Sequence, residues 1–153
     1  HVRQVCEEWL QTPEMHSKAG CTSPDRLDLR LPVQPLPVLF DGDHLRRVLV
    51  NLLDNARRHG TPEPGAVQLT LEPDGRGGVA LSVASDGAAM PPDVERHLFE
   101  PFFSTRSRGT GLGLYICREL CERYGATIDY RPGAHGERHS NVFRVVMRPA
   151  VKS

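Results

Sequence analysis

Three glycines at alternating positions mark the stretch of this chain with the strongest potential for chemistry. Gly109, Gly111 and Gly113 follow a segment rich in Ser, Thr and Arg, and they open an apolar run that we predict to be a helix. Because glycine has no Cβ, the backbone there can come close to a ligand. The amino end of a helix adds unpaired N–H groups and a positive dipole end, which suit phosphate. The stretch indicates phosphate binding, and the alternative interpretation is a flexible linker before a core helix.

This stretch matches neither of two familiar phosphate motifs. No Gly-Lys-Ser/Thr ends it, so it is not a P-loop. No strand immediately precedes it, so it is not a dinucleotide-binding fingerprint. Arg106 and Arg108 lie just upstream and add positive charge.

A second polar group lies on a predicted long helix that Asp41 or Asp43 caps. Asn51, Asn55 and Arg58 are spaced i, i+4, i+7, so at about 100° per residue they form a stripe away from the apolar one. The apolar stripe consists of Leu45, Val48, Leu49, Leu52, Leu53 and Ala56. Asn is a poor helix former, so two on one line need a reason. The stripe is either a solvated face or a polar wall that holds a metal–phosphate group.

Apolar periodicity over the rest of the chain predicts helices and strands in alternation. We expect helices over residues 2–10, 93–98 and 112–124, and strands over residues 27–31, 38–40, 67–71, 79–83, 126–130 and 141–147. A hairpin loop over residues 73–78 joins two of these strands. The chain reads as a single domain, 1–153, with a helix and connection over residues 1–24 and a core over residues 25–149.

Composition excludes several classes of protein. A length of 153 residues fits one domain with a sizeable core. A formal net charge of +0 argues against a nucleic-acid binder. The four cysteines form no C-x-x-C pair, which favours a reduced, cytosolic setting. The chain begins at His1 without Met, so we expect an excised piece of a longer protein whose missing part has room for a membrane segment.

Two histidines four residues apart, His135 and His139, raise the question of a zinc site. Glycine flanks them, and their order is not His-Glu-x-x-His. A solvated hairpin tip is the expected structure there.

Four ordered blocks together resemble the ATP-binding catalytic domain of bacterial sensor histidine kinases. Residues 45–59 look like the N box, residues 85–91 like a degraded G1 box, residues 98–105 like the F box and residues 109–114 like the G2 box. The likeness extends over residues 41–130 and is greatest to nitrogen-regulation and type IV pilus sensor kinases. It implies the GHKL (Bergerat) fold, an α/β two-layer sandwich in which a mixed sheet packs against helices and the nucleotide lies on the helical side.

The resemblance implies ATP and Mg²⁺ as cofactors and assigns site residues. Asn55 matches the Mg²⁺ ligand, Asn51 its polar companion, Arg58 a basic position near the phosphates and His59 a ring beside the nucleotide. An amide oxygen is a hard ligand that suits Mg²⁺. The other implied nucleotide-binding positions are Ser85, Asp86, Gly87, Phe99, Thr105, Arg106, Gly109, Thr110, Gly111, Leu112, Gly113 and Leu114.

The G1 block departs from the family pattern Asp-x-Gly-x-Gly, whose Asp accepts from the adenine amino group. Ser85 stands at that Asp, Gly87 keeps the first glycine and Ala89 replaces the second. If the second position needs a positive φ, Ala89 costs on the order of 1 kcal/mol. Either Asp86 shifts into the role, or Ser85 recognises adenine through a weaker neutral or water-bridged bond. We expect residual ATP binding.

The implied activity is that of a protein-histidine kinase. The domain would present the ATP γ-phosphate to a histidine on a separate dimerisation domain, and the phosphoryl group would pass to an Asp of a response regulator. None of the seven histidines precedes the acidic residue expected of a phosphoacceptor, so we expect no catalytic residue and no autophosphorylation in this piece alone. The implied partners are the dimerisation helices of the same protein, a homodimer when complete, and the response regulator. The implied location is cytoplasmic, with the full protein free or anchored in the inner membrane.

Three alternatives remain. A pseudokinase module with weak or lost ATP binding is motivated by Ser85 and Ala89. An ATPase of the gyrase or MutL type would use a Glu one turn before the metal-binding Asn to activate water. That position is Asn51 here, so we expect no steady hydrolysis. The third alternative is a domain without a ligand.

Overall fold

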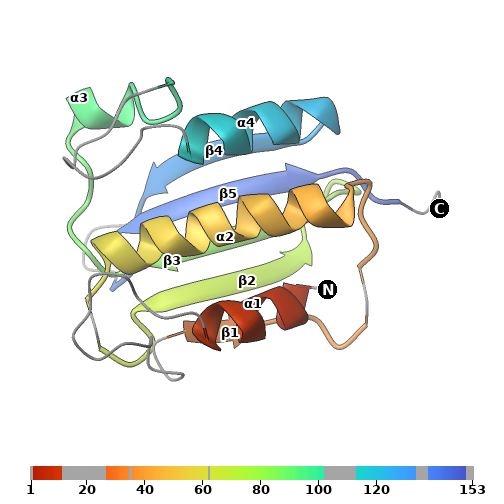
Figure 1. Ribbon diagram of the computed structural model, residues 1–153, viewed down its shortest axis with the longest axis horizontal. Helices are drawn as coiled ribbons and strands as arrows, with labels where there is room; N and C mark the ends of the chain where they lie inside the picture. The colour runs from red at the N-terminus through yellow and green to blue at the C-terminus, as the bar shows by residue number, and fades with distance from the viewer. Residues whose placement is uncertain are drawn as a thin grey trace.

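The computed structural model describes residues 2–11, 27–34, 36–61, 63–101, 113–133 and 138–150. Figure 1 shows their arrangement, a sheet with helices over one face. The helices are α1 (Val2–Gln11), α2 (Gly42–His59), α3 (Pro92–Glu95) and α4 (Gly113–Arg123). The strands are β1 (Leu27–Arg30), β2 (Val67–Pro73), β3 (Val79–Ser85), β4 (Thr127–Pro132) and β5 (Asn141–Met147).

The five strands form one mixed sheet of order β1-β2-β3-β5-β4. β1 runs parallel to β2, and the other three pairings are antiparallel. β2 and β3 form the expected hairpin, in which the Asp74 carboxylate accepts hydrogen bonds from the backbone N–H groups of Arg76 and Gly78. Gly75 and Gly77 have φ of +82° and +90° there, a region that side chains disfavour.

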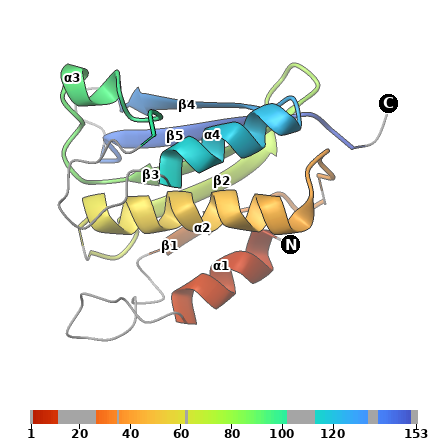
Figure 2. The same cartoon turned by 45° about the horizontal axis from the view of Figure 1, so that its top comes forward.

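The core lies between the sheet and one helical layer. Side chains on the strands alternate, so one set faces the helices, and this set is buried. Its members include Val67, Leu69, Leu81, Val83, Phe143 and Val145. Figure 2 shows α1, α2 and α4 on the same side of the sheet. The predicted α/β two-layer sandwich is confirmed.

Helix α2 supplies most of the helical side of the core. Asp41 is its N-cap, and its carboxylate accepts from the backbone N–H groups of Asp43 and His44. The six residues of the predicted apolar stripe are buried, and so is Asn55, with 5% of its surface exposed. The solvated-face interpretation is therefore wrong for Asn55.

The first helix belongs to the core. Val5, Cys6 and Trp9 are buried where α1 packs on α2. The indole N–H of Trp9 donates to Asp54 Oδ1 at 2.8 Å, and the Arg57 guanidinium lies 5.0 Å from the centre of the Trp9 ring. These contacts fasten α1 along the outer side of α2.

Three predicted elements differ in extent. The helix expected over residues 93–98 is the four-residue α3, followed by turns. The strand expected over residues 38–40 is a single bridge between Val38 and Pro149, because prolines interrupt this stretch and cannot donate to a ladder. The helix expected from Leu112 is described from Gly113 and ends before Gly125, whose φ is +70°.

The two edge strands carry the same short charge pattern. On β1 the guanidinium of Arg30 lies 3.2 Å from the carboxylate of Asp28, and on β4 that of Arg131 lies 3.4 Å from that of Asp129. Each pair therefore places one negative and one positive side chain along an outer edge of the sheet.

Candidate functional site

The carboxyl end of α2 lies against the loop that follows β3. A Cβ added to Gly87 would stand 1.6 Å from the backbone oxygen of His59, a distance that no side chain tolerates. A Cβ on Gly60 would stand 3.3 Å from Oδ1 of Asp86 and 3.5 Å from the Cβ of Ser85. The glycine at position 87 therefore allows close backbone approach, and it is not among the glycines with positive φ.

Asp86 is held on the connection after α2. Its carboxylate accepts from the backbone N–H of Thr61 at 2.8 Å and from the Thr61 hydroxyl at 2.7 Å, and Arg138 lies 3.6 Å away. Burial alone would raise the pKa of Asp86, but the hydrogen bonds from Thr61 and the Arg138 charge hold that pKa below its usual value. The side chain is only 8% exposed. Asp86 is thus an anchored carboxylate with several partners.

Ser85 is the last residue of β3 and directly precedes Asp86. Val79, Leu81 and Val83 face the helices, and two-residue alternation continues this series to Ser85. Ser85 is 3% exposed, and its cross-strand partner on β5 is Asn141. Ser85, Asn141 and Asn55 are the three buried polar residues in the part of the chain that the structure describes.

Asn141 and Tyr130 hold the loop after β3 in place, and neither was predicted. The Asn141 amide donates to the backbone oxygens of Gly87 and Ala88, at 3.1 and 2.9 Å. Its oxygen accepts from the Tyr130 hydroxyl at 2.6 Å, and that hydroxyl accepts from Met90 N–H. The signal in the sequence is an Asn at the start of a strand that is otherwise apolar on its inner side.

Asn51 of α2 lies beside Gly113, the first residue of α4, and Asn55 lies one helical turn farther along α2. The Cys117 thiol, which is buried on α4, donates to the backbone oxygen of Val48 on α2 at 3.8 Å. Burial raises the pKa of the Cys117 thiol to about 12, so it remains protonated. A Cβ on Gly113 would meet only Asn51, at an ordinary 3.7 Å. Packing among the described residues therefore gives no reason for glycine at position 113.

The remaining predicted site residues divide into two groups. Phe99 packs edge-on against Phe143, with ring centres 6.1 Å apart. Leu114 is partly buried against the core, His59 is half-buried, and Arg58 is exposed. The following predicted site residues lie outside the described residues: Thr105, Arg106, Gly109, Thr110, Gly111 and Leu112.

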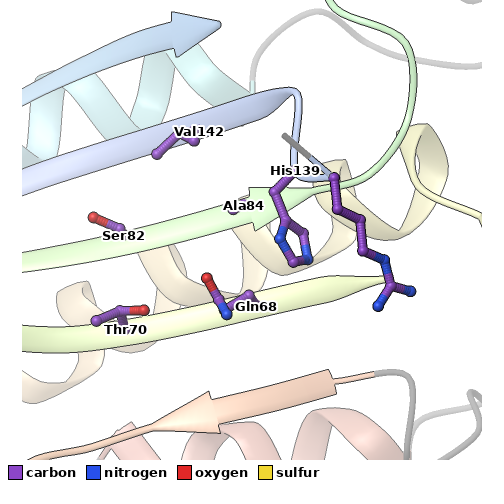
Figure 3. A pocket seen from close by; sticks show the side chains of 7 residues that line it. Gln68, Thr70, Ser82, Ala84, His139 and Val142 are labelled. Atoms are coloured by element: carbon purple, nitrogen blue, oxygen red, sulfur yellow. The ribbon is translucent and has the colours of Figure 1, made fainter. Parts of the chain in front are cut away.

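A polar hollow of about 310 Å³ lies on the opposite face of the sheet (Figure 3). Its lining includes Gln68, Thr70, Ser82 and the two basic residues Arg138 and His139. Both basic side chains are already bonded, Arg138 to the backbone oxygen of Pro64 and His139 to that of Gly65 at 2.9 Å. This hollow is remote from the helix-facing polar residues.

No zinc site is found where the structure describes the chain. Among those residues, no group of three or more His, Cys, Asp or Glu side chains could hold a metal. His139 is half-buried and bonds to the backbone oxygen of Gly65, whereas residues 134–137 at the expected hairpin tip lie outside the described residues. His135 lies outside the described part.

The family model described as "Histidine kinase-, DNA gyrase B-, and HSP90-like ATPase" matches residues 40–150. The chain belongs to this family. It is an ATP-binding catalytic domain of the sensor histidine kinase type, as the four motif blocks predict.

Relatives of this GHKL domain support the narrower class. It is 39% identical over 133 residues to sensor protein kinase PilS of Pseudomonas aeruginosa, a match that covers 85% of this chain and 25% of PilS. It is 41% identical over 113 residues to the C4-dicarboxylate transport sensor protein DctB of Rhizobium meliloti, covering 73% of this chain and 18% of DctB. The nucleotide-free catalytic domain of histidine kinase ThkA superposes with a TM-score of 0.71 at 28% identity, covering 96% of this chain and 89% of that one.

The GHKL domain spans about a quarter of PilS and less of DctB. No helix within the described ranges has the length and apolar character needed to cross a membrane. Nothing in these comparisons supports the pseudokinase alternative.

Proposed function

We propose that this domain binds Mg²⁺–ATP on the helical side of its sheet and presents the γ-phosphate to a histidine on the dimerisation helices of the same, longer protein. That protein would act as a homodimer and pass the phosphoryl group to a response-regulator Asp. We propose further that the domain lies in the cytoplasm.

Each proposed role follows from the chemistry of a side chain. Mg²⁺ supplies charge neutralisation between phosphate oxygens, and Asn55 would hold it through its amide oxygen. Asn51 would orient the same group, and Arg58 and Arg106 would offset charge. Gly109, Gly111 and Gly113 would let backbone N–H groups approach the phosphates, with Thr105, Thr110, Leu112 and Leu114 beside them.

At the other end of the nucleotide, the loop after β3 would contact the base. Gly87 would bring this loop against α2, and His59 and Phe99 would flank the nucleotide. The chain's own task is positioning, because phosphoryl transfer depends mainly on alignment and electrostatics.

The observation that carries the proposal is the buried Asn55. Burying an amide inside a helical layer costs free energy unless it gains a polar partner. Asn55 is 5% exposed, and it lies one helical turn before His59, whose backbone carbonyl lies against Gly87. The absence of any packing need for glycine at position 113 agrees with space kept for a ligand.

The test is calorimetric titration of this domain with a non-hydrolysable ATP analogue, with and without Mg²⁺. We expect Mg²⁺-dependent binding that Asn55→Ala abolishes. Gln68→Ala is the matched control, because it removes an amide from the opposite face of the sheet and should bind as the wild type does. Equal binding by Asn55→Ala and wild type would reject the metal role, and absence of binding by folded wild type would reject the proposed function.

A further inference from the structure

We propose that the base end of this site accepts 6-oxopurine nucleoside triphosphates about as well as ATP, because a serine hydroxyl, Ser85, is the side chain that reads position 6 of the purine. This inference rests on the proposed function and adds the nucleotide specificity of the same site.

The first step is that Asp86 is not available to the base. Its carboxylate accepts two hydrogen bonds from Thr61 and faces Arg138, which lines the hollow on the opposite face of the sheet. Turning it away from Thr61 toward a base would break both bonds and leave the Thr61 N–H without its acceptor. Strand alternation directs Ser85, not Asp86, to the helical side.

The second step is that the loop cannot shift by one residue to exchange these side chains. Gly87 touches the His59 carbonyl so closely that a Cβ is excluded, and a one-residue shift would bring Asp86 or Ala88 to that point. The Asn141 amide also uses both of its donor protons on the Gly87 and Ala88 carbonyls. Asn141, the cross-strand neighbour of Ser85, is therefore committed to the loop.

The third step concerns which base a hydroxyl can read. A carboxylate only accepts hydrogen bonds, so it favours the 6-amino group of adenine and repels a 6-oxo group. A serine hydroxyl donates as well as accepts, and its proton rotates to suit the partner. Ser85 can therefore accept from a 6-amino group or donate to a 6-oxo group with similar geometry. The purine ring nitrogen next to position 6 accepts a hydrogen bond in the 6-amino base and donates one in the 6-oxo base. A bridging water can pair with the ring nitrogen in both forms.

The deciding experiment compares the affinities of the intact domain for Mg²⁺–ATP and Mg²⁺–ITP by calorimetry. ITP is the closest probe because it replaces the 6-amino group by an oxygen and adds no 2-amino group. We expect the two dissociation constants to agree within about tenfold. A preference for ATP above about tenfold overturns the inference while leaving the proposed function intact. Failure of both nucleotides to bind a folded sample overturns the proposed function, and the inference with it.

Three variants identify the responsible side chain. Ser85→Asp should create a preference for ATP above about tenfold, because a buried carboxylate rejects the 6-oxo group. Ser85→Ala should weaken both nucleotides by a similar factor. Asp86→Asn should leave the ratio of the two affinities unchanged, and a changed ratio would show that Asp86 reads the base and reject the proposal. Thermal unfolding establishes that each variant is folded. The ratio of the wild-type dissociation constants for ATP and ITP tests the inference even if a variant does not fold.

Discussion

Two glycines of the proposed site have different physical reasons to be glycine. Gly87 is required by the fold, since its α-carbon faces the His59 carbonyl at the end of α2. Gly113 has only an ordinary contact with Asn51, so its reason must lie in the ligand or in residues 102–112. Substitution by alanine separates these two reasons.

We expect Gly87→Ala to lower the free energy of unfolding by about 1–3 kcal/mol or more, because the backbone must move to admit the methyl group. Gly113→Ala should change stability by no more than about 0.5 kcal/mol and weaken nucleotide binding. Urea unfolding and calorimetry measure the two effects. A stable Gly87→Ala protein would contradict the close approach of the loop to α2.

The lowered pKa of Asp86 predicts a pH dependence of stability. A carboxyl whose pKa is lower in the folded state binds protons more readily when unfolded. The contribution of Asp86 to the free energy of unfolding is therefore complete above the ordinary aspartate pKa of about 3.9, and it is lost as the pH falls through the folded-state pKa. In urea unfolding, the stability advantage of wild type over Asp86→Asn should be constant near neutral pH and should fall as the pH drops below about 4.

Asp129→Asn is the control for this pH series. The Asp129 carboxylate is exposed on an edge strand, and a surface ion pair of this kind contributes little. Its difference from wild type should stay small throughout. A pH-independent difference between wild type and Asp86→Asn would show that the Thr61 hydrogen bonds do not depend on the charge.

At the scale of elements, α1 is a part of the core that the family match does not include. The match begins at residue 40, yet Trp9 is 3% exposed and bonded to Asp54 of α2. We propose that the folding unit includes residues 2–11, as the prediction of one domain over the whole chain requires.

Trp9→Ala should cost about 3–5 kcal/mol, since it removes a buried aromatic side chain and its hydrogen bond. Glu8→Ala on the same helix is the comparison, because the Glu8–Arg46 ion pair is solvent-exposed and should contribute about 0–1 kcal/mol. Urea unfolding of both variants measures the difference. Equal stabilities would mean that α1 is merely attached to the outside of the domain.

Local patterns predicted most of these elements, because each depends on neighbours in the sequence. The Asp41 cap, the apolar stripe of α2 and the hairpin between β2 and β3 are of this kind. The order of strands is not local, since β5 lies between β3 and β4, and neither is the parallel pairing of β1 with β2. The packing of α4 on α2 is likewise not local, since it includes the hydrogen bond between His44 and Tyr124, which are 80 residues apart.

Within the candidate site, the sequence left Ser85 and Asp86 as alternatives for contact with the base. The alternation of apolar residues along the preceding strand nevertheless favours Ser85. The series Val79, Leu81, Val83 predicts that residue 85 faces inward, provided that the strand continues so far. The sequence cannot show that continuation, because it depends on pairing with Asn141. The hydrogen bonds from Thr61 that hold Asp86 also join segments 25 residues apart.

At the scale of the whole molecule, the domain contains no proposed phosphoacceptor. We expect no labelled protein when this chain alone is incubated with γ-labelled ATP and Mg²⁺, because in our proposal the nucleophilic histidine belongs to the dimerisation helices of the longer protein. Addition of those helices, taken from the same longer protein, should produce label on the helices only. Electrophoresis and autoradiography measure both. Label on the domain alone would contradict the proposal that the phosphoacceptor histidine lies outside this domain, and it would require a catalytic residue within the domain.

The paired charges on the two outer strands have a consequence for association. A strand at the edge of a sheet offers unpaired backbone groups that invite another sheet to join it. At both edges of this sheet, an incoming strand would first have to strip water from an aspartate and an arginine, which opposes such joining. The domain should therefore stay monomeric at high concentration. In the homodimer that we propose, association would then depend on the dimerisation helices and not on contacts between the sheets of the two catalytic domains.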